Sequence, residues 1–443
     1  MIEAKLQFER GLFTAGFATL DLILNEAKPN EVQRLEALVM AGTYMLFLDI
    51  DQADVFHQEA LNTAGISTEL RLRANFGLSE NAVYRGDMVA AERYVQNAQV
   101  DIHENTSLEL RLLYGFAKLE VMLRSGQFEE ADTLLLEVYK LEPDNLRTAT
   151  YEAQLRYYQS RFHAAANIIE RIRNQDPSSV YLFTLENDLA ISYWWTGNLE
   201  KAEQEALKSL EHWRNSPHVE ALSRMHLGFI RLSQGRFREA LEYMQQAKND
   251  SLALGSLTYE ADIEHRVGVI YFHAGQFDTA LKHLHQALTL MKTVGDPYRE
   301  ALILGVLVAV YATKGDIPHA KQYLLVAEQP TAQSQNLAAK GFLDQAKSVV
   351  CLQRGRLDEA RAYNLEAEAF ARQTELPEFL CFILLFKARL EPDPTPYLTE
   401  ALEIAIARGY KTQEFIIASA LNDTTRAESC LNFLREHAPE GWF

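Results

Sequence analysis

Apolar residues recur at helical spacing along almost the whole chain, and the pattern is clearest between residues 257 and 327. There, residues 267–280 are followed by a similar run at 307–320, displaced by 40 positions. Each copy has a tyrosine, then a glycine four residues later, and an alanine five residues after the glycine. This pattern predicts a repeated unit of two helices joined by a short turn.

The residue that ends the first helix of each unit lets the repeat be followed through the chain. These residues, called anchors below, are spaced by 34 to 40 positions. Glycine suits an anchor because a residue leaving a helix often needs a positive φ, which costs glycine little. The anchors are Gly11, Leu48, Gly86, Gly126, Ser160, Gly197, Gly235, Gly275, Gly315 and Gly355, with Leu48 and Ser160 as imperfect members.

Two further positions of the unit hold small side chains, and they predict a close approach of the two paired helices. The residue five after the anchor is Gly16, Ala53, Ala91, Ala131, Ala165, Ala202, Ala240, Ala280, Ala320 or Ala360. The residue seven before it is Ala41, Ser79, Leu119, Ala153, Ala190, Gly228, Gly268, Val308 or Ser348, of which Leu119 and Val308 depart from the rule.

A unit of this length and register resembles the tetratricopeptide repeat. The longer units are similar to the repeats of MalT-like regulators and of peptide-sensing regulators of Gram-positive bacteria. The resemblance implies an all-α, right-handed superhelical solenoid of about ten helix pairs. We expect the superhelix to span residues 1–390. Residues 391–443, which begin with the proline-rich stretch 391–396, are expected to form a repeat remnant and capping helices.

Charge and composition restrict the partner and the compartment. The chain carries 61 acidic and 43 basic side chains, a net charge of -18, which predicts no binding to nucleic acid or to anionic membranes. It has no apolar stretch long enough for a membrane span and no apolar leader at its start. Its three cysteines have no close spacing, so neither a disulfide framework nor a zinc site is predicted. We therefore expect a cytoplasmic protein.

No catalytic, cofactor or metal motif is predicted. Residues 11–16 resemble a phosphate loop, but the required Lys and Ser or Thr are replaced by Phe17 and Ala18. His283 and His285 would point about 200° apart on a helix, so they cannot hold one ion from the same face. The chain also shows neither the NTPase module nor the DNA-binding module of MalT-like regulators. We expect no enzymatic activity, no cofactor and no metal.

The resemblance also predicts a partner-binding groove on the concave face, lined by the first helices of successive units. The chaperone-binding members of the family hold a carboxylate with an Asn six residues before the anchor, and that Asn is absent here, so a chaperone tail is not expected. The predicted groove residues are Arg73, Phe76, Tyr84, Glu120, Arg124, Arg147, Gln154, Tyr157, Tyr158, Asn187, Trp194, Trp195, Phe229, Asp262, His265 and His273.

The aromatic residues 157–158 and 193–195 lead to the functional hypothesis. Three consecutive helical residues sweep about 200°, so at least one ring is expected to reach the groove or the outer surface. We expect a non-catalytic scaffold that binds a protein or peptide partner through these rings, with the acidic balance favouring basic flanking residues. The alternatives are a ligand- or peptide-sensing regulator, an enzyme-associated subunit, and rings that all belong to the core. The sequence leaves the partner's identity and the oligomeric state open.

Overall fold

The computed structural model describes residues 1–9, 12–26, 30–176, 182–213, 216–334 and 336–442. The structure is 83% helical, and these residues contain 24 α-helices and no strand. The predicted all-α helical solenoid is therefore confirmed. The anchor Gly11 lies outside the described residues.

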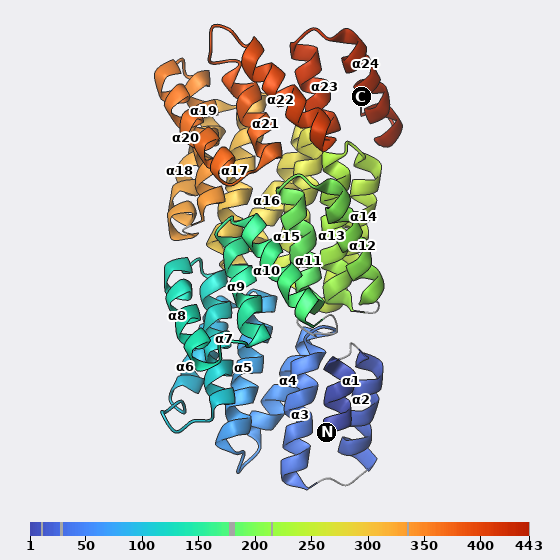
Figure 1. Ribbon diagram of the computed structural model, residues 1–443, viewed down its shortest axis with the longest axis vertical. Helices are drawn as coiled ribbons and strands as arrows, with labels where there is room; N and C mark the ends of the chain where they lie inside the picture. The colour runs from blue at the N-terminus through green and yellow to red at the C-terminus, as the bar shows by residue number, and fades with distance from the viewer. Residues whose placement is uncertain (10–11, 27–29, 177–181, 214–215, 335, 443) are drawn as a thin grey trace.

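Consecutive helices form pairs along the chain (Figure 1). The first helices of the pairs are α1 (Ile2–Glu9), α3 (Glu31–Met45), α5 (Thr68–Arg85), α7 (Leu108–Arg124), α9 (Leu146–Tyr158), α11 (Leu182–Trp195), α13 (Pro217–Ser233), α15 (Leu257–His273), α17 (Pro297–Lys314), α19 (Leu337–Gln353), α21 (Pro377–Lys387) and α23 (Lys411–Ala420). The second helices are α2 (Phe13–Asp21), which continues into the π-helix η1 (Leu22–Glu26), α4 (Ile50–Asn62), α6 (Met88–Gln99), α8 (Phe128–Leu141), α10 (Phe162–Gln175), α12 (Leu199–His212), α14 (Phe237–Leu254), α16 (Phe277–Val294), α18 (Ile317–Ser334), α20 (Leu357–Gln373), α22 (Thr395–Arg408) and α24 (Thr424–His437).

The anchors account for the pairs from α1/α2 to α19/α20, and residues 377–437 add two more pairs. The predicted boundary after residue 390 falls in the turn between α21 and α22. No helix among the described residues is both long and apolar enough to cross a membrane.

The turn after each first helix has the backbone that the anchors predict. Every described anchor glycine has a positive φ, between 71° and 92°, and Ser160 adopts the same region at 62°. Leu48 does not; its turn closes through backbone hydrogen bonds from Leu48 and Asp49 to the carbonyl of Met45. Glycine thus marks the turns that leave the helix in the left-handed region.

The two small-residue positions meet across each pair, as the register predicts. All nine alanines five residues after an anchor are fully buried. A Cβ added to Gly268 would lie 3.3 Å from the carbonyl oxygen of Ala280 and 2.7 Å from Leu284 Cγ. In other pairs a serine uses the same contact, because the hydroxyl of Ser79 donates to the carbonyl of Ala91.

We expect Gly268→Leu to destabilise the protein by roughly 1–3 kcal/mol, because the new side chain must enter this close helix contact. Lys282→Ala, on the exposed face of α16, should change the unfolding free energy by less than about 0.5 kcal/mol. Urea denaturation of both variants measures the difference. Equal midpoints would show that the repeat register is wrong.

The superhelix turns far enough to stack on itself. The hydroxyl of Ser216, which caps α13, donates to the carbonyl of Phe47 just after α3, 169 residues earlier. The hydroxyl of Ser256, which caps α15, donates in the same way to the carbonyl of Tyr84 near the end of α5. In both cases a first helix begins on top of the end of the first helix five pairs before it. Figure 1 shows the result as a lower tier of N-terminal helices and an upper tier of C-terminal ones.

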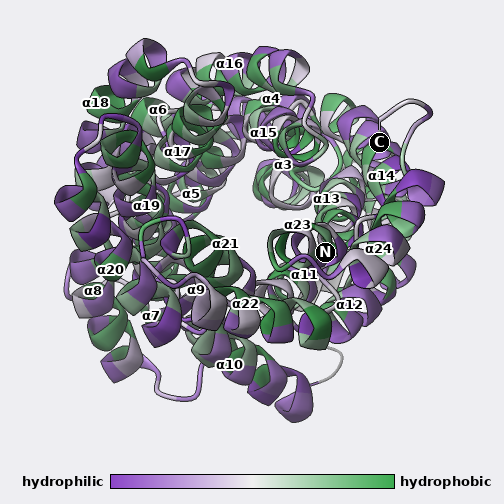
Figure 2. Cartoon of the chain, turned by 90° about the horizontal axis from the view of Figure 1, so that it is seen from above, coloured by the Kyte–Doolittle hydropathy of each residue, from purple (hydrophilic) through white to green (hydrophobic). Residues whose placement is uncertain are grey.

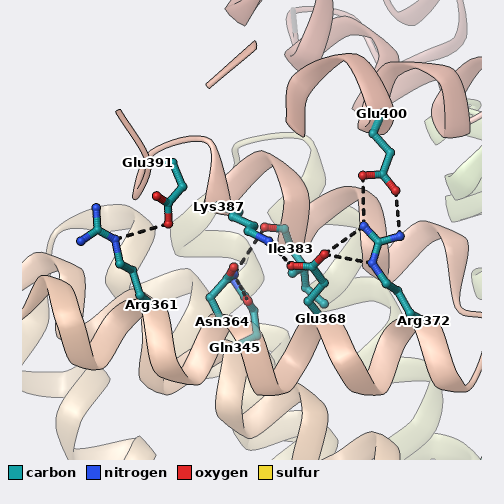
Figure 3. Close-up of polar contacts among 9 residues, drawn as sticks. All are labelled: Gln345, Arg361, Asn364, Glu368, Arg372, Ile383, Lys387, Glu391 and Glu400. Carbon is teal, nitrogen blue, oxygen red and sulfur yellow. Dashed lines mark hydrogen bonds and ion pairs between the residues drawn. The ribbon is translucent and has the colours of Figure 1, made fainter. Parts of the chain in front are cut away.

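Polar side chains along one face of α20 fix the C-terminal pairs (Figure 3). The carboxylate of Glu368 accepts from Lys387 Nζ of α21 at 2.6 Å and from Arg372 at 2.9 Å. Arg372 also pairs with Glu400 of α22 at 2.8 and 3.0 Å. These contacts join α20 to both helices of the next pair, and so help to place α21 against the interior of the superhelix.

Candidate functional site

The interior of the superhelix is lined by first helices. Seen from above, α13, α15, α17, α19 and α21 lie around the axis, and their partners α14, α16, α18 and α20 lie outside them (Figure 2). Two cavities in the described part of the chain are lined mainly by first helices, one in each half of the chain. They are called the C-terminal cavity and the N-terminal cavity below.

The C-terminal cavity has a volume of about 450 Å³ and is lined mainly by apolar side chains of α9, α11, α13, α15, α17, α19 and α21. Seven of the predicted groove residues line it: Tyr157, Trp194, Trp195, Phe229, Asp262, His265 and His273.

The two tryptophans are half-buried and line this cavity with different neighbours. Trp194 stacks on Phe229 at 4.9 Å between ring centroids, and its indole Nε1 donates to the Ser233 hydroxyl at 2.8 Å. Trp195 stacks on the buried Phe162 at 5.2 Å. Tyr193 turns the other way, donates to Glu170 and lies under Lys201. The three rings therefore face different sides of α11, and two of them reach the interior.

The prediction missed the part of the lining that comes from α17, α19 and α21. Most of these residues could have been predicted from their positions relative to the anchors. Leu302 and Phe342 lie 13 residues before their anchors, as the predicted Arg73 does. Ala309 and Val349 lie six residues before theirs, as the predicted Glu120 does. The missed lining of α21, which has no anchor, includes Phe379, Phe382 and Leu385.

The N-terminal cavity is larger, about 1240 Å³, and more acidic. Its lining includes Glu36, Glu69, Glu80, Glu109, Glu120 and Glu142 against Lys5, Arg73 and Arg147. Six predicted groove residues line it: Arg73, Phe76, Tyr84, Glu120, Arg147 and Gln154.

Two further predicted residues, Arg124 and Tyr158, lie between the linings of the two cavities. The Arg124 guanidinium is 3.0 Å from the carboxylate of Glu120, and it lies 5.8 Å from the ring centroids of Tyr84 and Tyr158. The ring of Tyr158 in turn contacts that of Tyr298 in the C-terminal cavity, at 6.0 Å. These side chains fill the axis of the superhelix where the two tiers meet.

The prediction that Asn187 faces the groove is wrong. Its side chain is fully buried, donates to the Ser209 hydroxyl at 3.1 Å and accepts from the Ser223 hydroxyl at 3.0 Å. These bonds join α11, α12 and α13. The amide satisfies buried hydroxyls between helices, which is a structural role.

The described residues hold no cluster of three or more potential metal ligands. Burial raises the pKa of the thiols of Cys351, Cys381 and Cys430, so these cysteines are protonated at neutral pH. Burial also raises the pKa of Glu378, in the C-terminal cavity, to about 7, with Ser233 and Gln413 as its hydrogen-bond donors. What the two interior cavities offer is apolar surface, charge and hydrogen-bonding groups.

Comparison with known proteins indicates the same class of fold as the spacing of the anchors does. Residues 189–387 match the family model of the MalT-like TPR region. This part of the chain is thus similar to tetratricopeptide-type repeats, and the helical-repeat fold continues on both sides of it. A curated relative, the Clustered mitochondria protein homolog of Caenorhabditis elegans, is 38% identical over 73 residues. That match covers 16% of this chain and 6% of the relative, so the chain spans a small part of the relative's length.

Solved structures with a similar fold share little sequence with this chain. The APC/C hetero-tetramer Cut9-Hcn1 has a TM-score of 0.57 at 14% identity, over 99% of this chain and 80% of that one. A Rap protein complexed with Competence and Sporulation Factor has a TM-score of 0.54 at 13% identity, over 84% of this chain and 100% of that one. The Rap conjugation gene regulator of plasmid pLS20, in complex with the Phr* peptide, also has a TM-score of 0.54, at 12% identity, over 75% of this chain and 94% of that one. At these identities the comparisons show the fold alone.

Proposed function

We propose that this protein is a non-catalytic scaffold that binds a peptide segment of a partner inside its superhelix, with bulky apolar side chains of the segment in the C-terminal cavity. The observation that carries the proposal is the lining of this cavity. Rings from four successive pairs meet there, including Tyr157, Trp194, Phe229 and Phe272. Rigid aromatic side chains hold a peptide at low entropic cost, which is why they dominate the affinity of many interfaces.

The comparisons support a peptide rather than a globular surface as the bound element. Two of the similar structures are described as complexes, one with the Competence and Sporulation Factor and one with the Phr* peptide, and both share the helical solenoid. They also favour the second candidate function, a peptide-sensing regulator, in which the bound segment is a free signalling peptide. Both candidates use the same cavity. We propose the cytoplasm as the compartment, as the composition predicts.

Filling the C-terminal cavity should weaken peptide binding strongly. Ala309 lines it from α17 and is half-buried, so Ala309→Trp places an indole in the empty volume. A peptide selected on the wild-type protein from a random display library should bind this variant at least roughly 30-fold more weakly, the size of a lost anchor contact. Isothermal titration calorimetry with the selected peptide measures the loss.

Leu325→Trp is the matched control, because Leu325 is exposed on the outer helix α18. Both variants should keep the wild-type unfolding free energy within about 1 kcal/mol. Undiminished peptide binding by Ala309→Trp, or failure of the wild type to select any peptide, would refute the proposed function.

A further inference from the structure

The C-terminal cavity differs in charge from the rest of the molecule. Three arginines line it, Arg266, Arg299 and Arg389, against two carboxylates, Asp262 and Glu378. The chain as a whole carries 61 acidic and 43 basic side chains, and six glutamates face three cations in the N-terminal cavity. An excess of arginine in an apolar cavity of an acidic protein requires an explanation.

The two carboxylates of the C-terminal cavity have partners other than Arg266. Arg299 Nε is 3.0 Å from Asp262 Oδ2, and its guanidinium also pairs with Asp296. Glu378 accepts from Ser233 and Gln413. Asp262 lies one helical turn before Arg266, yet its ion pair is with Arg299.

Arg266 itself has no ion pair among the described residues. Its guanidinium lies 3.9 Å from the centroid of the Phe229 ring, and its Nε is shut off from solvent without a hydrogen-bond partner. Its neighbour His265, whose Nε2 is also buried and without a partner, lines the same cavity. Burial lowers the pKa of His265 to about 4, so the imidazole is neutral at pH 7 and Arg266 is the cation of this pair.

The Arg266 guanidinium thus lines an apolar cavity without an ion pair of its own, and an anion that enters the cavity would provide one. We propose that the C-terminal cavity binds a peptide segment that carries a carboxylate next to bulky apolar side chains, and that Arg266 is the counter-ion of this carboxylate. This inference rests on the proposed function and names the chemistry of the peptide. The acidic balance of the whole chain had led us to expect a peptide with basic flanking residues. Such a peptide would suit the acidic N-terminal cavity, but not the C-terminal one.

A peptide fits the cavity better than an alkyl carboxylic acid does. Besides Arg266 and His265, the lining contains Thr313, Gln345 and Ser233, which lie on α17, α19 and α13. Hydrogen-bonding groups distributed over several helices match a backbone that offers a carbonyl and an amide at each residue. An alkyl chain has no group that could hydrogen-bond to any of them.

The charge preference can be tested with a pair of dyes that share one ring system. Anilinonaphthalene sulfonate carries an anionic group, and N-phenylnaphthylamine lacks it. We expect the wild type to prefer the sulfonate, and Arg266→Gln to reduce that preference roughly tenfold to a hundredfold, the strength of a charged hydrogen bond. Arg266→Lys, which keeps the charge, should restore much of it.

Two controls identify the site. Arg93→Gln removes an arginine that lies over a ring, that of Tyr94, but on the exposed outer face of α6, and it should keep the wild-type preference. Ala309→Trp should remove the dye fluorescence that belongs to the cavity. An unchanged preference in Arg266→Gln would overturn the assignment of Arg266.

The source of the carboxylate is tested with the peptide selected on the wild type. It is compared with versions in which the C-terminus is amidated or each Asp and Glu is replaced by Asn and Gln. One of these changes should weaken binding to the wild type at least roughly tenfold and have little effect on Arg266→Gln. If the peptide needs no carboxylate yet depends on the cavity, the proposed function stands and this inference is wrong. If dodecanoate displaces the dye and no peptide does, the carboxylate that Arg266 binds does not come from a peptide, and this inference is wrong.

Discussion

Replacing Gly126 by alanine should destabilise the protein far more than the same substitution at Gly355. Both residues are anchors and both have a left-handed backbone, with φ of 76° and 71°. The two sites differ in what lies above them. A Cβ on Gly126 would be 2.8 Å from Cα and 2.9 Å from the carbonyl oxygen of Ser334, at the end of α18, whereas one on Gly355 would meet nothing within 4 Å.

The comparison separates two reasons for glycine. The left-handed backbone costs an alanine about 1–2 kcal/mol at either site. At Gly126 the new methyl group also presses on the backbone of the overlying tier, which cannot rotate away as a side chain can. Overpacking of this kind costs about 1–3 kcal/mol more. We therefore expect about 1–2 kcal/mol for Gly355→Ala and about 2–5 kcal/mol for Gly126→Ala.

Urea denaturation gives the two free energies, and small-angle X-ray scattering shows whether the tiers separate. Gly355→Ala is the internal control for backbone strain. If the two variants lose the same stability, the tiers do not rest on each other at Gly126.

The stacking of the tiers explains which features of the fold could be predicted. The glycine and alanine positions depend on contacts within one helix pair, so a local register finds them. The contact of Ser160 with Asn336 joins residues 176 positions apart, and it exists only because five pairs complete a turn. Ser160 reads as an imperfect anchor in the sequence. In the structure its hydroxyl also accepts from the backbone amide of Ala338 at the start of α19, so the serine serves the contact between tiers.

The same limit applies to the candidate site. The register indicates which residues of a first helix face the axis, and most of the predicted groove residues line one of the two cavities. It does not indicate what faces them from across the axis. Arg124 and Tyr158 point to the axis but contact each other and Tyr84, so they fill it. Asn187 was placed at the wrong angle, because a position on a helix face can also meet the neighbouring pair.

The histidines give the largest expected effect, a loss of stability when the pH falls below neutral. In the structure, burial lowers the pKa of six of them: to about 4 for His57, His265 and His273, to about 3 for His218, well below the usual value for His226, and below it for His285. A folded protein with these histidines resists their protonation, and the unfolded chain does not.

The sign follows from the number of protons bound in each state. Between the pKa of the folded state, near 4, and that of the unfolded chain, about 6.5, the unfolded chain binds the extra proton, so unfolding is favoured as the pH falls. Asp188 and Glu378 oppose this trend, because burial raises the pKa of both to about 7 and the folded state holds their protons. Burial also raises the pKa of Glu80, Asp250, Glu300 and Asp344, which act in the same direction as these two. Each proton that the unfolded chain binds in excess corresponds to about 1.4 kcal/mol per pH unit, and we expect the histidines to outweigh the carboxyl groups.

We therefore expect the unfolding free energy to fall steeply as the pH is lowered from about 6.5 to about 5.5. The variant His57→Leu should make this fall less steep. His57 is the best single test, because its ring is fully buried and neither of its nitrogens has a hydrogen-bond partner. It also packs against Gly42 and Gly77, where a leucine of similar volume fits a small apolar space. The variant should lose about 1.4 kcal/mol per pH unit of the wild-type slope, whereas His103→Gln, at an exposed position, should leave it unchanged. Urea denaturation at several pH values gives both slopes, and a wild-type stability that stays level across this range would contradict the burial of these histidines.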